Sequence, residues 1–143
     1  MRRAAALGQQ RLLLRFEAVD YQCEVWLNGG HLGNHKGGYT PFAFDASHLI
    51  HRTGTNTLVV RVRDPMEGTQ IRGKQSPVAE GIFYTRVSGI WQTVWLEAVP
   101  TVAHIDELTI TADLHRILVN ASVAVGQPAL SKAGELVLEL KAQ

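Results

Sequence analysis

The segment from Ser88 to Glu97 reads Ser-Gly-Ile-Trp-Gln-Thr-Val-Trp-Leu-Glu. Its Ser-Gly pair predicts a tight turn, and the residues that follow alternate in the manner of a β-strand. The two expected faces of this strand are Val94, Leu96 and Ala98 on one side and Thr93, Trp95 and Glu97 on the other. The segment therefore predicts a turn that leads into a strand with one apolar side.

The same period-two alternation recurs along the chain, and no segment of helical length has apolar residues spaced three or four apart. Strands are expected at 12–18, 21–27, 31–35, 42–44 and 58–63. Asn28-Gly29-Gly30 supplies residues that accept the positive φ of a hairpin turn. Asp45 is placed to cap a brief helical turn at 48–50. The chain is therefore expected to be all-β.

A second set of strand patterns begins after Pro100. Apolar residues alternate along 108–112, 117–125 and 136–140, and residues 126–134 have the composition of a loop. This change predicts a domain boundary near residue 100. We expect one domain in residues 1–100 and the start of a second in residues 101–143.

Composition limits the classes of function. The chain has 143 residues, of which 45% are hydrophobic and 19% charged, with 14 basic and 13 acidic side chains. This balance is typical of a globular protein and gives no basic surplus for nucleic acid. No run approaches the roughly 20 apolar residues of a membrane span, and the basic start at 1–7 lacks a signal-peptide core. We expect a cytoplasmic chain without membrane or nucleic-acid partners.

The sequence contains no pattern typical of a metal or cofactor site. Cys23 is the single cysteine, and we interpret it as a buried, inert thiol. His31 and His35 have no cysteine or carboxylate nearby, so solvated or hydrogen-bonded imidazoles are favoured over metal ligands. The glycines around them precede Tyr39-Thr40-Pro41-Phe42 where a phosphate-binding loop would need a helix. We predict no metal and no cofactor.

Three further motifs accompany the segment at 88–97. They are Trp26-Leu27-Asn28-Gly29, Gly37-Gly38-Tyr39-Thr40-Pro41-Phe42 and Arg72-Gly73-Lys74-Gln75. Together they resemble the N-terminal sugar-binding domain of family 2 glycoside hydrolases, a family of β-galactosidases, β-glucuronidases and β-mannosidases. Over 12–99 the resemblance implies a jelly-roll, galactose-binding-like β-sandwich without its opening strands. Residues 101–143 resemble the first strands of the immunoglobulin-like β-sandwich that follows it in the family.

The resemblance implies an accessory role without catalytic residues. Retaining glycosidases need two carboxyl groups about 5 to 5.5 Å apart. The family places both in a downstream barrel, one within an Asn-Glu pair that is absent from this sequence. Asp106 and Glu107 are neighbours on an expected strand and would point to opposite faces. We expect the chain alone to be inactive. The resemblance implies that the parent protein is a retaining β-glycosidase, which could form a homo-oligomer.

The segment from Met66 to Gly81 is the expected ligand-contacting loop. Loops of this length are usually functional or disordered, and Arg72, Lys74 and Gln75 carry donors suited to sugar hydroxyl or carboxylate groups. The resemblance places them near the substrate, together with Tyr84 and Arg86. Phe83 departs from the family, because many β-galactosidases and β-glucuronidases have a sugar-contacting aspartate at the matching position. The alternative is an ordinary solvated loop.

Alternatives remain for the tryptophans and for the whole chain. Trp26, Trp91 and Trp95 suit sugar stacking, but core or inter-domain packing is favoured because tryptophan is usually well buried. A free-standing carbohydrate-binding module is the alternative function, and a structural remnant is a third. A jelly roll without its opening strands would expose sheet edges that an independent module is expected to cover.

Overall fold

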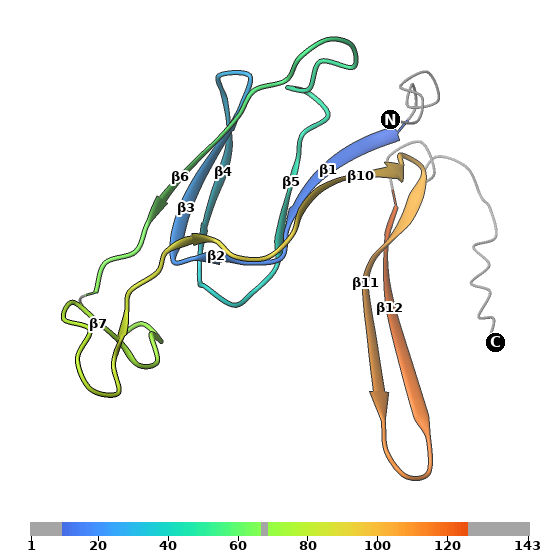
Figure 1. Ribbon diagram of the computed structural model, residues 1–143. Coiled ribbons are helices and arrows are strands. Elements are labelled where there is room, and N and C mark those ends of the chain that lie inside the picture. The colour runs from blue at the N-terminus through green and yellow to red at the C-terminus, as the bar shows by residue number, and fades with distance from the viewer. Residues whose placement is uncertain (1–9, 67–68, 126–143) are drawn as a thin grey trace. The chain divides into compact units, whose positions relative to one another are not determined.

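The computed structural model describes residues 10–66 and 69–125, which form strands β1 to β12 and no helix (Figure 1). The predicted all-β class is confirmed. The described residues fall into two compact units, one of residues 11–98 and one of residues 99–125 with Gln10. None of the described segments is a helix with the length and hydropathy of a membrane span.

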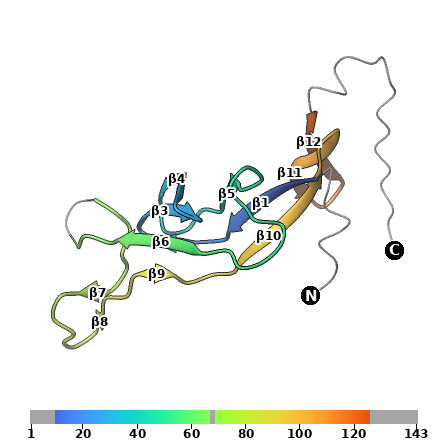
Figure 2. The ribbon, with the colours of Figure 1, turned by 90° about the horizontal axis from the view of Figure 1, so that it is seen from above.

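Two three-stranded sheets build the first unit, and Figure 2 shows them from above. In one sheet β1 (Gln10–Phe16) lies between β5 (Phe42–Asp45) and β10 (Val94–Pro100). In the other, β3 (Gln22–Leu27) lies between β4 (Gly30–Lys36) and β6 (Leu58–Arg63). The pairs β1–β5, β3–β4 and β3–β6 are antiparallel. The core contains residues from both sheets, as in a β-sandwich.

Phe16 lies at the centre of this core with no exposed surface. Its ring stacks on Phe42 at 4.9 Å between centroids and meets the edge of Phe44 at 6.4 Å. From the other sheet, the alternate residues Cys23, Val25 and Leu27 are buried as predicted. Full burial of one such large apolar side chain stabilises the fold by about 1.5 to 3 kcal/mol. The period-two pattern thus identifies the core face of β3.

The predicted apolar face of β10 is wrong beyond its first residue. Val94 packs against the core, but Leu96 is 45% exposed and Ala98 is also exposed. On the opposite face, Glu97 is half-buried and forms an ion pair with Arg15 of the neighbouring strand β1. The alternation itself is present, but the sandwich core extends only as far as Val94. Among the described residues, nothing covers the next two positions of that face.

Asn28 and Gly29 form the predicted hairpin turn between β3 and β4. Their φ angles are 51° and 82°, and asparagine and glycine are the residues that adopt this left-handed region most readily. The Asn28 amide donates to Leu49 O at 2.8 Å and to Asn56 Oδ1 at 2.7 Å. Its Oδ1 accepts the backbone N–H of Thr57 at 2.9 Å. The turn is therefore tied to the segment that connects β5 with β6.

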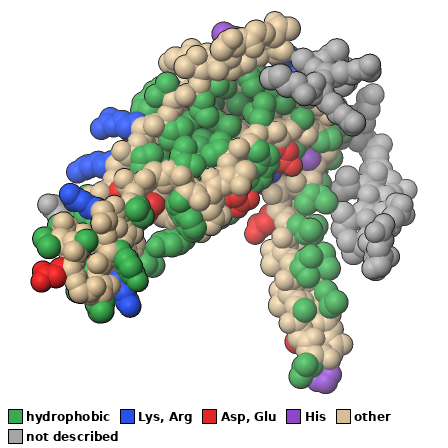
Figure 3. Space-filling model, viewed as in Figure 1, with side chains coloured by type: hydrophobic (Ala, Val, Ile, Leu, Met, Phe, Trp, Pro, Cys, Tyr) green, Lys and Arg blue, Asp and Glu red, His purple; other side chains and the backbone are tan. Residues whose placement is uncertain are grey.

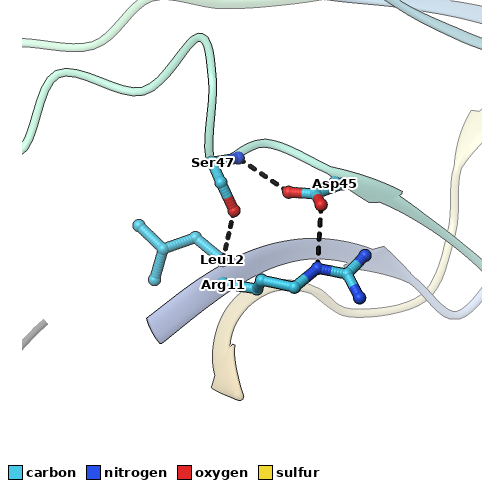
Figure 4. Close-up of polar contacts among 4 residues, drawn as sticks. All are labelled: Arg11, Leu12, Asp45 and Ser47. Carbon is cyan, nitrogen blue, oxygen red and sulfur yellow. Dashed lines mark hydrogen bonds and ion pairs between the residues drawn. The ribbon is translucent and has the colours of Figure 1, made fainter. Parts of the chain in front are cut away.

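Asp45 closes the end of β5 onto β1, as Figure 4 shows. It accepts the Ser47 backbone N–H at 3.0 Å and the Arg11 Nε–H at 2.9 Å, while Ser47 Oγ accepts the Leu12 N–H at 2.8 Å. The predicted cap is confirmed, since a turn at 47–49 follows at once. Burial alone would raise the pKa of Asp45, but the hydrogen bonds from Ser47 and the charge of Arg11 together lower it.

Shorter pairs complete the first unit. β2 (Val19–Asp20) pairs antiparallel with β9 (Gly89–Ile90). β7 (Gln75–Ser76) pairs with β8 (Tyr84–Thr85) and is parallel to it. The segment predicted as a long loop is therefore irregular where the structure describes it, except for this small parallel pair.

The described part of the second unit contains an antiparallel hairpin of β11 (Ala103–Ala112) and β12 (Ile117–Val125). Its register sets Leu108 opposite Ala121 and Ile110 opposite Val119, so the predicted apolar positions share one face. Asp113 accepts the backbone N–H groups of His115 and Arg116 in the turn, which lower its pKa. The third predicted strand, at 136–140, lies outside the described residues. The immunoglobulin-like assignment and the 1–100 and 101–143 domain bounds stay predictions.

We expect Asn28→Ala to lower the free energy of unfolding by about 2 to 3 kcal/mol. The substitution removes three side-chain hydrogen bonds and places alanine at a positive φ. Chemical denaturation followed by tryptophan fluorescence measures the change. The matched control is Asn34→Ala at an exposed position of β4, which should change stability by less than about 0.5 kcal/mol. Equal effects of the two variants would contradict the role of Asn28.

Asp45→Ala should destabilise the chain by about 1 kcal/mol at neutral pH, because both partners of the ion pair are partly solvated. The folded-state pKa of Asp45 lies below its ordinary value of 3.8, so its contribution is present above that pH. It should disappear as the pH falls through the folded pKa. Denaturation of wild type and variant between neutral and acid pH tests this convergence.

The control for Asp45 is Glu24→Gln, which removes the carboxylate of a more exposed ion pair with Arg61. This change should cost less than about 0.5 kcal/mol at any pH. A wild-type advantage over Asp45→Ala that persists undiminished in acid would refute the assigned electrostatic role.

Candidate functional site

The five predicted ligand-contacting residues lie within residues 72–86, a lobe built around β7 and β8. The backbone N–H of Tyr84 donates to Lys74 O at 2.9 Å, and Gln75 pairs with Tyr84 in the parallel register. The N–H of Gln75 in turn donates to Arg72 O at 3.3 Å. Arg86 follows β8 directly. Figure 3 shows that basic, acidic and hydrophobic side chains are mixed on this lobe.

The side chains of these residues have different surroundings. The Arg72 guanidinium donates to the backbone oxygen of Met66, so part of its donor capacity is used within the loop. Lys74, Tyr84 and Arg86 are exposed. Gln75 is half-buried, and its Oε1 accepts the N–H of Val87 at 2.7 Å. Of the five, Gln75 is the one that lines a described cavity.

This cavity has a volume of about 240 Å³ and is built from separated segments of the first unit. Its lining residues are Asp20, Tyr39, Gln75, Val87, Ser88 and Trp91. They come from β2, from the segment after β4, from β7 and from both sides of β9. The pairing of Asp20 with Gly89 brings the carboxylate next to the Ser-Gly turn. The motif at 88–97 thus contributes to a site as well as to the fold.

Asp20 supplies the only charge in the lining of this cavity. Burial raises its pKa, and the nearby charge of Asp64 raises it further. The described residues place no hydrogen-bond donor or cation on the Asp20 carboxylate, whereas Asp64 accepts Gln70 Nε2 at 2.6 Å. A Cβ added to Gly38 would come within 2.6 Å of Asp20 Oδ1, so this glycine lets the backbone approach the carboxylate. Asp20 is therefore a half-buried acceptor with unused capacity.

Two exposed aromatic rings lie beside this carboxylate. Trp91 is 53% exposed and Tyr39 is 57% exposed, and their rings meet edge to face at 5.8 Å. The Trp91 indole N–H donates to Gly38 O at 2.8 Å, which holds the ring at the surface. Trp95 is 36% exposed, and Trp26 is half-buried with its ring 5.3 Å from that of His31. Packing into the core of this unit is therefore wrong for Trp91 and Trp95, whereas packing against another domain stays a prediction.

Two other cavities carry weaker indications of a site. One of about 310 Å³ lies over β4, β3 and β6 and is lined by Gln22, Cys23, Glu24, Asn34, His35, Lys36, Arg61 and Arg63. Most of these are the polar residues expected on the solvated face of an antiparallel sheet. One of about 400 Å³ contains the Arg15–Glu97 pair, whose charges already satisfy each other. Cys23 is buried as predicted, and burial raises the pKa of its thiol.

The predicted hydrogen-bonded histidine is confirmed for His35. Its Nε2 lies 3.2 Å from both Gly37 O and Thr40 Oγ1, and its ring stacks on Phe42 at 4.0 Å. Within residues 10–66 and 69–125, no three or more histidine, cysteine or acidic side chains are arranged to hold a metal ion.

Comparison with known proteins agrees with this fold and identifies a family. The family model described as "Glycosyl hydrolases family 2, sugar binding domain" matches residues 3–100. A β-glucuronidase of Sus scrofa is 32% identical over 123 residues, which cover 73% of this chain and 18% of that protein. A β-galactosidase of Thermoanaerobacter pseudethanolicus is 33% identical over 88 residues, which cover 62% of this chain and 11% of that protein.

Solved structures show the same fold. The Ruminococcus gnavus β-glucuronidase matches with a TM-score of 0.62 at 17% identity, covering 84% of this chain and 22% of that one. The chain belongs to glycosyl hydrolase family 2 and carries its sugar-binding domain. The family predicted from the four motifs is confirmed. The chain spans between about a tenth and a fifth of the length of these curated relatives.

Sequence reasoning missed Asp20 and Tyr39 and undervalued Trp91. Tyr39 and Trp91 lie within the quoted motifs, but nothing in the sequence shows that they meet. The sequence signal that could have indicated these two residues is an aromatic residue close to a glycine. At such a position a hydrogen bond to the backbone can hold the ring at the surface, as Gly38 O does for Trp91. Arg72, Lys74, Tyr84 and Arg86 remain predicted contacts outside the cavity lining.

Proposed function

We propose that this chain acts as the non-catalytic carbohydrate-contacting part of a family 2 glycoside hydrolase that cleaves a β-glycoside with retention. The observation that carries the proposal is the lobe around β7 and β8, where Arg72, Lys74 and Gln75 present donors within a few residues. Such donors orient sugar hydroxyl and carboxylate groups through directional hydrogen bonds. Holding the substrate in reactive geometry then accelerates a displacement that other parts of the enzyme perform.

The acidic residues of the described chain support a role without catalysis. Four carboxylates are engaged in ion pairs, namely Glu24, Asp45, Glu97 and Asp113. Asp20 and Asp64 are close enough to interact, but Asp64 is held by Gln70 and does not line the cavity of Asp20. A retaining mechanism needs both carboxyl groups at one glycosidic bond.

The isolated chain should release nitrophenol from nitrophenyl β-galactoside, β-glucuronide and β-mannoside only at the background rate. The physical reason is that Glu17 and Glu97, the two carboxylates that line one described cavity together, are not both free, because Glu97 is paired with Arg15. Absorbance measurements on repurified protein test this outcome. Turnover that persists after repurification and is lost in Asp20→Asn or Asp64→Asn would show that the chain is itself an enzyme.

In an enzyme that joins this chain to a family 2 catalytic barrel, Lys74→Ala should lower kcat/KM about fivefold to tenfold. The loss of one solvent-exposed hydrogen bond of typical net strength, about 1 kcal/mol, accounts for this size. Lys74 is exposed, so thermal stability should not change. Steady-state kinetics on the natural substrate and a thermal melt are the measurements.

Lys36→Ala is the matched control, because Lys36 is also exposed but lies on β4 with its Nζ 5.7 Å from the Tyr21 ring centroid. It should leave kcat/KM unchanged. If Lys74→Ala also leaves the kinetics unchanged, the lobe is solvated surface and the proposed contact is wrong.

A further inference from the structure

The cavity lined by Asp20, Tyr39 and Trp91 has the composition of a small-ligand site. Pockets that bind small molecules combine aromatic or apolar walls with a few convergent polar groups. Here Trp91, Tyr39 and Val87 supply the apolar part. Its volume of about 240 Å³ lies below the roughly 300 to 1,000 Å³ of drug-sized pockets. This size suits a single sugar ring better than an oligosaccharide.

The aromatic wall is held in place before any ligand arrives. The Trp91 N–H is bonded to Gly38 O, and the Tyr39 ring packs against the indole edge to face. More than half of each residue's surface remains exposed. The apolar C–H face of a pyranose can stack on such a ring, and a ring fixed in advance loses little freedom on binding.

The polar groups are arranged around this wall. Gln75 Oε1 is occupied by the Val87 N–H, so the amide orientation is fixed and its Nε2 remains as a donor. The Asp20 carboxylate is an acceptor without a donor among the described residues, and the Ser88 hydroxyl both donates and accepts. One acceptor, one donor and one group that does both match a set of neighbouring sugar hydroxyls.

The charge of the cavity selects among sugars. Asp20 is the single charged residue of the lining, and Asp64 lies near enough to disfavour further negative charge. No lysine or arginine lines the cavity to pair with a ligand carboxylate. A uronate would therefore meet a like charge in a partly desolvated site, whereas the hydroxyl groups of a neutral sugar would donate hydrogen bonds to the Asp20 carboxylate.

We propose that Asp20, Tyr39, Gln75, Ser88 and Trp91 form a subsite for one neutral pyranose ring that disfavours uronates. This inference rests on the proposed carbohydrate-contacting function and adds the class of sugar and the residues that select it. Stacking on Trp91 and Tyr39 provides the affinity, and Asp20 provides the preference for an uncharged sugar.

The test is a titration of the full 143-residue chain, labelled with ¹⁵N, with methyl β-D-galactopyranoside, methyl β-D-glucopyranoside and methyl β-D-glucuronide. The indole N–H signal of Trp91 reports the site directly, and its loss in Trp91→Phe identifies it. A neutral glycoside should shift this signal with a dissociation constant on the order of 1 mM. The glucuronide should bind at least about fivefold more weakly, as like charges disfavour it.

Variants separate stacking from charge. Tyr39→Ala and Trp91→Ala should weaken the neutral sugar about tenfold, since both remove apolar contact. Asp20→Asn keeps the shape of the side chain but removes its charge. The ratio of affinities for the neutral glycoside and the glucuronide should therefore fall to near one. Trp95→Ala is the control, because Trp95 is exposed but does not line this cavity, and it should bind as the wild type does. Retained thermal melts show that each variant is folded.

Three results would overturn the subsite. They are an indole signal of Trp91 that no sugar shifts, a glucuronide that binds as tightly as the neutral glycosides, and an Asp20→Asn variant with unchanged preference. The last of these applies even if Trp91→Ala fails to fold. Sugar-induced shifts confined to Arg72 and Lys74 would reject the subsite while preserving the proposed function, and the kinetics of Lys74→Ala test that function independently.

Discussion

The packing of Phe16 between two sheets holds the first unit together. Its strand lies at the centre of one sheet, while the buried residues Cys23, Val25 and Leu27 come from the central strand of the other. The stacked contact with Phe42 brings β5 into the same core. Since neither three-stranded sheet can bury its apolar face alone, the register of both depends on this shared contact.

Two networks of polar side chains stabilise the connections between strands that lie outside the hydrophobic core. Asn28 ties the β3–β4 turn to the segment between β5 and β6, and Asp45 ties the end of β5 to β1. Both use side chains to satisfy backbone N–H groups that lack a strand partner. These hydrogen bonds fix the course of the connections between the two sheets, so each later strand pairs with its observed neighbour.

The candidate site depends on how the connections bring separate segments together, more than on any single sequence motif. Asp20 ends β2, Tyr39 follows β4, Gln75 lies on β7 and Trp91 follows β9. The β2–β9 pair and the bond from Trp91 to Gly38 O are the contacts that bring these segments together. Binding groups on loops held by a rigid sandwich are a common arrangement, because loops tolerate change while the core does not.

The sequence alone determined the all-β class, the core face of β3 and the Asn28-Gly29 turn, because period-two burial and positive φ restrict residue choice locally. It also determined the family, through the four quoted motifs. It did not determine that Leu96 and Ala98 lie beyond the core, that Trp91 stays at the surface, or that Asp20 reaches the Ser-Gly turn. Those outcomes depend on which distant segments meet. Only the tertiary structure decides such meetings, because contacts between residues far apart in the chain leave no periodic signal in the sequence.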